Sequence, residues 1–202
     1  MCLSMPEPDW KREHITGLEE SIRFFSNENK FDREKYVISS LLDALSITYI
    51  DSELTEAPEP TDVGFRDANF QVKEVMQNAR RRGDELKAAL EKAKAANTYS
   101  ELLETYTPQD ISIGAIGEKS VARADDLLHK YGKKERMHMD LVLYFNYLDY
   151  HEIHFDFEVP TTRDYRSLSV LSNRFAVVPY TCEEAPAFLK SAVDTLKERH
   201  IT

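Results

Sequence analysis

The fold of this chain is decided by the stretch Pro60-Thr61-Asp62-Val63-Gly64-Phe65-Arg66-Asp67-Ala68-Asn69-Phe70-Gln71-Val72-Lys73. Apolar and polar residues alternate on both sides of its middle, which is the period-2 pattern of two half-buried strands. The pattern therefore predicts a β-hairpin with one buried face and one polar face.

Burial of all the apolar strand residues also predicts the register of this hairpin. A turn centred between residues 67 and 68 pairs Phe65 with Phe70. On the other face, the same register sets Asp62 directly opposite Lys73, with Gln71 on the diagonal. A carboxylate, an amide and an amine then converge, which is typical of a functional site. The alternative is an ion pair between Asp62 and Lys73 on a solvated face, worth at most about 1 kcal/mol.

Asp62, Gln71 and Lys73 follow the order of the proline-aspartate...(Asp/Glu)-x-Lys signature, so the chain resembles the PD-(D/E)xK, or restriction-endonuclease-like, nuclease superfamily. Two positions depart from the signature. Thr61 separates Pro60 from Asp62, and Gln71 stands where that superfamily more often has an acid. The whole chain also resembles a bacterial family of similar length, without an established function, whose members are described as putative endonucleases.

The resemblance implies an α/β (α+β) fold with a restriction-endonuclease-like core: a mixed central sheet flanked by helices, in the order helix-strand-strand-strand-helix-strand. It also implies metal-dependent cleavage of nucleic acid, DNA in particular, with Mg²⁺ or Mn²⁺ as cofactor. Asp62 and Gln71 would offer oxygen atoms to the cation, which polarises the phosphate and activates water. Lys73 would orient that water or stabilise the developing charge.

A glutamine in place of an acid removes one negative charge from this site, and Glu34 is the candidate that compensates for it. Residues 31–45 are predicted to be a helix, and Glu34 lies along its apolar stripe. The resemblance implies that an acid on the first helix joins the metal site, so Glu34 is a candidate metal ligand and catalytic residue. The alternative is that the helix dipole favours an acid in the first turn without any metal.

The net charge of −10 has the wrong sign for binding a phosphate polymer, but the charge is unevenly distributed. Residues 1–62 carry 6 basic and 14 acidic groups, whereas residues 63–136 carry 14 basic and 12 acidic groups. Within this middle part, Arg80, Arg81, Arg82 and Lys87 are predicted to contact the phosphates of nucleic acid. The alternative is a solvated helix face with compensating acids.

The remaining patterns suggest a single nuclease-like domain over residues 1–202, with residues 76–105 as a helical insertion. Further helices are predicted over residues 11–25, 114–131 and 183–199. Further strands are predicted over residues 47–51, 137–147, 151–159 and 175–178.

Composition restricts the setting in which the chain acts. No apolar run approaches 18 residues, and the N-terminus lacks the basic and apolar segments of a secretory signal, so we expect a cytoplasmic protein without a membrane partner. Two cysteines are too few for a disulfide framework. The sequence is compatible with a monomer or a homo-oligomer.

A second function fits the sequence as well. The chain can be a non-catalytic nucleic-acid or protein interaction module that retains a nuclease-like fold. The missing second carboxylate and the acidic net charge both favour this alternative.

Overall fold

The computed structural model describes residues 9–76, 82–103, 109–146, 150–153 and 162–199. The chain divides into two compact units. One unit combines Met1–Arg33 with Asn78–Thr107, and the other combines Glu34–Gln77 with Pro108–Thr202. The segment predicted as a helical insertion therefore belongs with the N-terminal segment and not with the hairpin.

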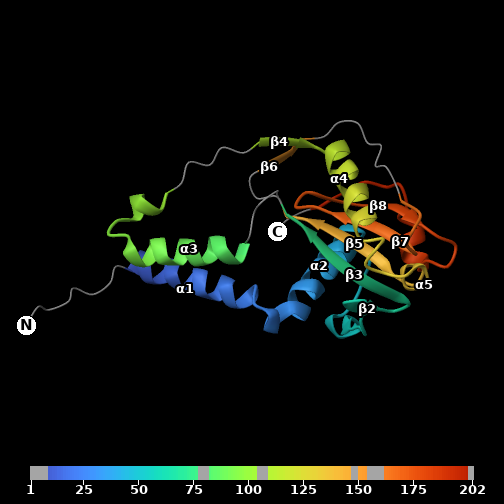
Figure 1. Cartoon of the computed structure of the whole chain (residues 1–202), viewed down its shortest axis with the longest axis horizontal. Coiled ribbons are helices and arrows are strands. Elements are labelled where there is room, and N and C mark those ends of the chain that lie inside the picture. Colours follow the sequence, from blue (N-terminus) through green and yellow to red (C-terminus); the bar gives the residue numbers. More distant parts are fainter. Residues whose placement is uncertain (1–8, 77–81, 104–108, 147–149, 154–161, 200–202) are drawn as a thin grey trace, which may run out of the picture. The chain divides into compact units, whose positions relative to one another are not determined.

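The first unit is built on two helices that lie side by side, α1 (Asp9–Phe24) and α3 (Arg82–Ala95) (Figure 1). The ring of Trp10 meets the ring of Tyr99 edge-on, with 5.8 Å between the centroids. The ammonium group of Lys11 donates hydrogen bonds to the carbonyls of Lys94 and Ala96, at 2.7 and 2.9 Å. These contacts tie the start of α1 to the end of α3. The unit also contains two short 3-10 helices, η1 (Asn27–Asn29) and η3 (Tyr99–Leu102).

The second unit contains a seven-stranded mixed sheet with the order β1-β2-β3-β5-β7-β8-β9. The central strands β3, β5 and β7 are parallel, and the outer strands pair in an antiparallel manner. The strands are β1 (Thr55–Glu56), β2 (Val63–Phe65), β3 (Ala68–Val75), β5 (Asp140–Phe145), β7 (Ser167–Leu171), β8 (Phe175–Thr181) and β9 (Lys197–Glu198). A separate parallel pair is formed by β4 (Gln109–Ser112) and β6 (Tyr150–Ile153).

Helices cover both faces of the sheet, with α2 (Lys30–Ala44) and α4 (Ile113–Asp126) on opposite sides (Figure 1). The apolar face of α4 packs on Leu141, Leu143 and Val170 in one buried cluster, to which no buried residue of α2 belongs. The other elements are η2 (Asp51–Glu53), α5 (Lys133–Arg136) and α6 (Ala187–Lys190). No helix among the described residues is both long and apolar enough to cross a membrane.

The ring of Phe65 lies on the sheet face opposite to α4. This ring is 1% exposed and lies edge-on to Tyr49, which follows α2, and to Phe188 of α6, with centroid distances of 6.4 and 5.5 Å. Because side chains alternate along a strand, Phe70 and Val72 point to this face, and Gln71 and Lys73 point to the face covered by α4.

Three predicted helices are confirmed as α1, α2 and α4, although α4 ends at Asp126 instead of reaching residue 131. Two other predictions are wrong. Residues 47–51 form no strand, because the carbonyl of Thr48 is bound by the Arg66 side chain and not by a neighbouring strand. The closing helix is only the single turn α6, which ends at Lys190; the chain then bridges to β8 through Val193 and returns to the sheet as β9.

The three other predicted strands are found as β5, β6 and β8, with shifted ends. Residues 154–159 of the predicted strand 151–159 lie outside the described residues.

The hairpin forms as predicted, but its register differs by two residues. Phe65 pairs with Ala68, not with Phe70, and Val63 pairs with Phe70. A shift of two residues leaves every side chain on the same face, so the apolar pattern alone could not distinguish the two registers.

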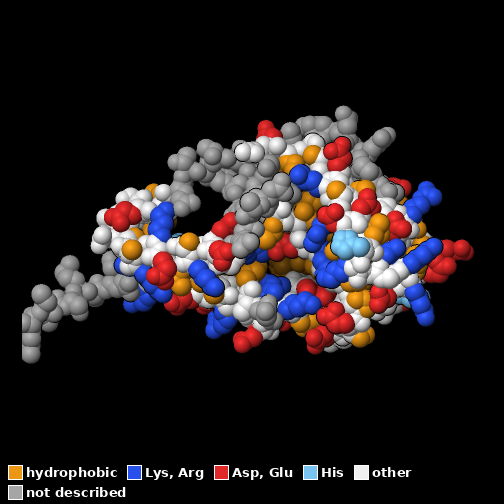
Figure 2. Space-filling model, in the orientation of Figure 1, with side chains coloured by type: hydrophobic (Ala, Val, Ile, Leu, Met, Phe, Trp, Pro, Cys, Tyr) orange, Lys and Arg blue, Asp and Glu red, His pale blue; other side chains and the backbone are white. Residues whose placement is uncertain are grey.

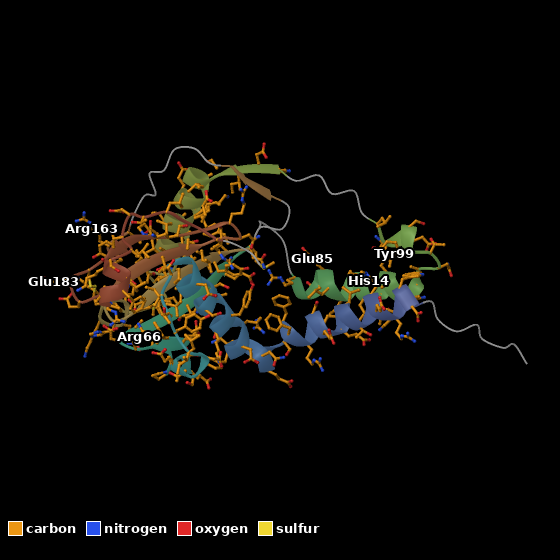
Figure 3. All side chains as sticks on the ribbon, turned by 180° about the vertical axis from the view of Figure 1, so that it is seen from behind. His14, Arg66, Glu85, Tyr99, Arg163 and Glu183 are labelled. Carbon is orange, nitrogen blue, oxygen red and sulfur yellow. The ribbon has the colours of Figure 1, made fainter. Side chains whose placement is uncertain are left out.

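The shorter turn depends on Arg66, which adopts a left-handed conformation (φ 53°) that is unfavourable for a residue other than glycine. Its guanidinium group donates to the carbonyl of Thr48 at 2.8 Å and pairs with the carboxylate of Glu53 at 3.2 Å (Figure 3). The group also lies 4.6 Å from the centre of the Phe65 ring. These contacts offset the conformational cost of the tight turn.

Candidate active site

The observed register brings Asp62 opposite Gln71 instead of Lys73, which corrects the predicted direct pair. The backbone N–H of Asp62 donates to the carbonyl of Phe70 at 2.7 Å and so extends the hairpin ladder by one residue. The side-chain Nε2 of Gln71 donates to Oδ2 of Asp62, and the backbone N–H of Val72 donates to the same oxygen at 2.9 Å. Asp62 and Gln71 are 4% and 2% exposed, so this is a buried carboxylate held by N–H donors.

Tyr131 extends the pair into a chain of three side chains. Its hydroxyl donates to Oε1 of Gln71 at 3.0 Å. The NH₂ group of Gln71 thus faces Asp62, and its side-chain oxygen faces Tyr131. Gln71 therefore connects Asp62 to Tyr131 through one donor group and one acceptor atom.

The turn that carries Tyr131 is itself held in place by Arg136. The guanidinium group donates from Nη1 to the carbonyls of Tyr131 and Leu128, the latter at 2.8 Å, and from Nε to the carbonyl of Asp164 at 3.3 Å. The ammonium group of Lys130 lies 5.4 Å from the centre of the Tyr131 ring. The sequence did not point to Tyr131, because it lies in a turn 60 residues beyond Gln71 and belongs to no motif.

Lys73 lies two residues beyond Gln71 on β3 and is half-buried. It points to the same face of the sheet as Gln71, because β3 is regular from residue 70 to residue 75 in its pairing with β5. Asp62, Gln71 and Lys73 therefore share a face, with Gln71 as the direct neighbour of Asp62.

Glu34 lies near the start of α2 and is half-buried, three residues before the buried Val37. The body of α2 covers the sheet face opposite to Gln71 and Lys73. The helix that carries Glu34 and the Asp62–Gln71 pair therefore lie on different sides of the sheet.

The predicted phosphate-contacting residues belong to the first unit. Arg80 and Arg81 lie outside the described residues. Arg82 opens α3 and places its guanidinium group 4.2 Å from the centre of the Phe25 ring. Lys87 is exposed on α3.

A second buried polar cluster surrounds Asp140 at the start of β5. Its carboxylate is 0% exposed and accepts from the guanidinium group of Arg166, from the hydroxyl of Ser167 at 2.8 Å and from the backbone N–H of Asn69 at 2.9 Å. Arg166 also donates to the carbonyl of Asp67 in the hairpin turn, at 3.0 Å. The cluster fastens the turn to β5 and β7, and we assign it a structural role.

A hard cation such as Mg²⁺ binds oxygen atoms and retains several waters, so Asp62 and Gln71 fit it by the type of donor that they carry. The observed amide orientation presents nitrogen, not oxygen, to Asp62. A half-turn of the amide would present Oε1, and the Tyr131 hydroxyl could then accept from Nε2. The described residues contain no group of three or more His, Cys, Asp and Glu side chains that could hold a metal ion.

Known proteins resemble this chain over nearly its whole length. Residues 7–200 match a family described as "Putative endonuclease, protein of unknown function (DUF1780)". A solved structure from Pseudomonas aeruginosa strain PAO1, described as a protein of unknown function of the monooxygenase superfamily, is similar with a TM-score of 0.63 and 23% sequence identity over 97% of each chain. At this identity, the likeness establishes a shared fold alone. No protein with a curated description is similar enough to count as a relative.

Proposed function

The chain belongs to this family of putative endonucleases, and from that premise we propose that it is a divalent-metal-dependent phosphodiesterase that cleaves nucleic acid, DNA in particular. The observation that carries the proposal is the buried Asp62–Gln71 pair, with Lys73 on the same face of β3. A carboxylate and an amide oxygen can act as ligands of a hard cation, and an amine can stabilise the charge that develops on the phosphate.

The order of elements around the site supports a restriction-endonuclease-like core. Within the second unit, α2, β1, β2 and β3 are followed by β4, α4, α5 and β5, and β3 pairs with β5 in parallel. Apart from β4, which pairs outside this sheet, and the single turn α5, this matches the helix-strand-strand-strand-helix-strand order that the resemblance implies. The hairpin delivers Asp62 and Gln71, and α4 leads to the turn that carries Tyr131.

In the proposed mechanism, Asp62 and Gln71 would hold Mg²⁺ or Mn²⁺, which would polarise the phosphate and lower the pKa of the attacking water. The N–H of Val72 fixes the direction of the Asp62 carboxylate. Lys73 stabilises the negative charge that develops on the phosphate, and the low local dielectric around these buried groups strengthens that effect. Glu34 has no part in this mechanism, because the helix that carries it lies on the other side of the sheet from the Asp62–Gln71 pair.

A second candidate is the non-catalytic interaction module. The specific observation in its favour is that the amide nitrogen of Gln71 already donates a hydrogen bond to Oδ2 of Asp62, which would otherwise be open to a cation. The net charge of −10 agrees with this alternative.

Thermal unfolding with increasing Mg²⁺ or Mn²⁺ separates the two candidates. A ligand that binds only the folded state raises the melting temperature as its concentration exceeds the Kd. The nuclease proposal predicts such a rise for wild type and its loss in Asp62→Asn. Asp126→Asn, at an exposed position of α4, is the matched control and should behave as wild type. Unchanged melting of the wild type at millimolar metal would favour the module.

A further inference from the structure

The turn that carries Tyr131 has a charge opposite to that of the chain as a whole. Residues 127–138, here called the basic turn, contain four Lys or Arg residues and one acid, whereas the net charge of the chain is −10. The exposed members of the basic turn include His129, Lys130, Lys133, Lys134 and His138. In Figure 2, Lys, Arg and His side chains lie on the visible face in the region where Figure 1 places α4 and α5, with Asp and Glu side chains among them.

The basic turn is directly connected to the candidate active site. Tyr131 is 6% exposed and points inward, where its hydroxyl reaches Oε1 of Gln71. The residues on either side of it in sequence, Lys130 and Gly132, are exposed. A phosphate chain bound along the basic turn would therefore lie beside the site and not at a distant part of the unit.

The shape of the basic turn is fixed by hydrogen bonds within the chain. Arg136 binds the carbonyls of Leu128 and Tyr131, and the backbone N–H of Gly132 donates to the carboxylate of Glu135 at 2.7 Å. The carboxylate of the one acid in the turn thus caps its own helix, α5. A surface that is ordered before binding loses little conformational entropy when a partner binds.

Resting on the proposed nuclease function, we infer that the basic turn is the surface that binds the phosphate backbone of the nucleic acid substrate and sets it beside Gln71. Exposed lysines that neutralise phosphates supply sequence-independent affinity. Because Tyr131 connects the basic turn to the site, the favoured partner is a nucleic-acid polymer that must reach the site. A membrane surface or an acidic peptide would have no need of this connection.

This assignment competes with the phosphate contacts predicted on α3, where the lysines are accompanied by Asp84, Glu85 and Glu91. Its arginine Arg82 already stacks on Phe25. The two surfaces lie in different compact units, so separate variants can test them.

The test compares two double variants of the full chain, Lys133→Ala/Lys134→Ala in the basic turn and Lys87→Ala/Lys92→Ala on α3, all at exposed positions. Fluorescence anisotropy with a labelled DNA duplex, in EDTA and at several salt concentrations, gives the Kd and its salt dependence without any cleavage. The basic-turn variant should bind about tenfold more weakly, and its slope of log K against log salt should be smaller by about 2. The α3 variant should match wild type.

The outcomes separate this inference from the proposed function on which it rests. If the basic-turn variant binds DNA as tightly as wild type and the α3 variant does not bind it, the inference is overturned. The chain would still be a nucleic-acid-binding protein. No wild-type binding overturns both. Equally tight binding of a poly-glutamate peptide, with the same dependence on Lys133 and Lys134, also overturns the inference. Circular dichroism melting curves that coincide with wild type show that both variants are folded.

Discussion

The hydroxyl of Tyr131 donates a 3.0 Å hydrogen bond to the side-chain oxygen of Gln71 and so joins the turn after α4 to strand β3. Gln71 extends this series of hydrogen bonds, because its amide nitrogen donates to Asp62. In this series Tyr131 donates, Gln71 accepts and donates, and Asp62 accepts. The series can therefore be tested one position at a time.

Tyr131→Phe removes the donor at one end of the series. The Gln71 oxygen then loses its partner in a site that is 2% exposed, so we expect the free energy of unfolding to fall by about 1 to 3 kcal/mol. Urea denaturation measures the change. Tyr36→Phe is the control, because Tyr36 is 56% exposed and the same deletion there should have no measurable effect.

Gln71→Glu places a second carboxylate against Asp62 in a buried site. Without metal and at neutral pH, we expect a loss of about 3 kcal/mol, because two buried like charges replace a hydrogen bond. Mg²⁺ or Mn²⁺ should raise the melting temperature of the variant more than that of wild type, and cleavage should be preserved or increased. Thermal melting with and without metal measures both effects.

The double variant Asp62→Asn/Gln71→Glu is the control for that prediction. It exchanges the amide and the carboxylate between the two strands, so one N–H still faces one carboxylate. Its melting temperature without metal should recover most of the loss. A double variant no more stable than Gln71→Glu alone would show that the hydrogen bond is not the reason for the effect.

Asp140→Asn tests the structural assignment of the second buried cluster. An amide in this place offers N–H groups to Arg166 and Ser167, which are already donors, and leaves the guanidinium group without its charge partner. We expect a loss of about 3 to 5 kcal/mol in the free energy of unfolding. Asp126→Asn, exposed on α4, should change it little, so chemical denaturation of the two variants isolates the contribution of burial.

Burial raises the pKa of Tyr165 to about 12 from its ordinary 10.0. Its hydroxyl donates to the carbonyl of Ala124 at 2.9 Å, inside the α4 cluster. Because the folded state favours the protonated form, this contribution is complete below pH 10 and is lost as the pH rises from 10 towards 12. The loss amounts to about 3 kcal/mol. Between pH 10 and 12, the free energy of unfolding should fall more steeply with pH in wild type than in Tyr165→Phe. Equal slopes would contradict the raised pKa of Tyr165.

Local pattern was sufficient to predict the hairpin and the three helices with clear apolar stripes. The faces of Asp62, Gln71 and Lys73 follow from alternation along the strands, which a two-residue shift of register does not change. The register itself depends on the side chain of Arg66, which binds Thr48 and Glu53 and so permits a tight turn. Such contacts between distant segments leave no mark in a local pattern.

The sequence did not reveal Tyr131 as part of the site, and this too results from contacts between distant segments. Tyr131 reaches Gln71 only because β3 and β5 pair in parallel and α4 crosses the sheet between them. The closing helix was overestimated because the helix ends at Lys190 and the chain then bridges to β8 through Val193. Helical spacing over residues 183–199 could not reveal a strand as short as β9.

Cleavage of DNA with Mg²⁺ or Mn²⁺ by wild type and by Lys73→Ala tests the proposed nuclease centre most directly. Lys119→Ala, at an exposed position of α4, is the matched control for loss of a lysine. The proposal predicts metal-dependent cleavage by wild type and by the control, and a loss of about 10²-fold or more in Lys73→Ala with the fold intact. No metal-dependent cleavage by wild type, or equal cleavage by all three proteins, would contradict it.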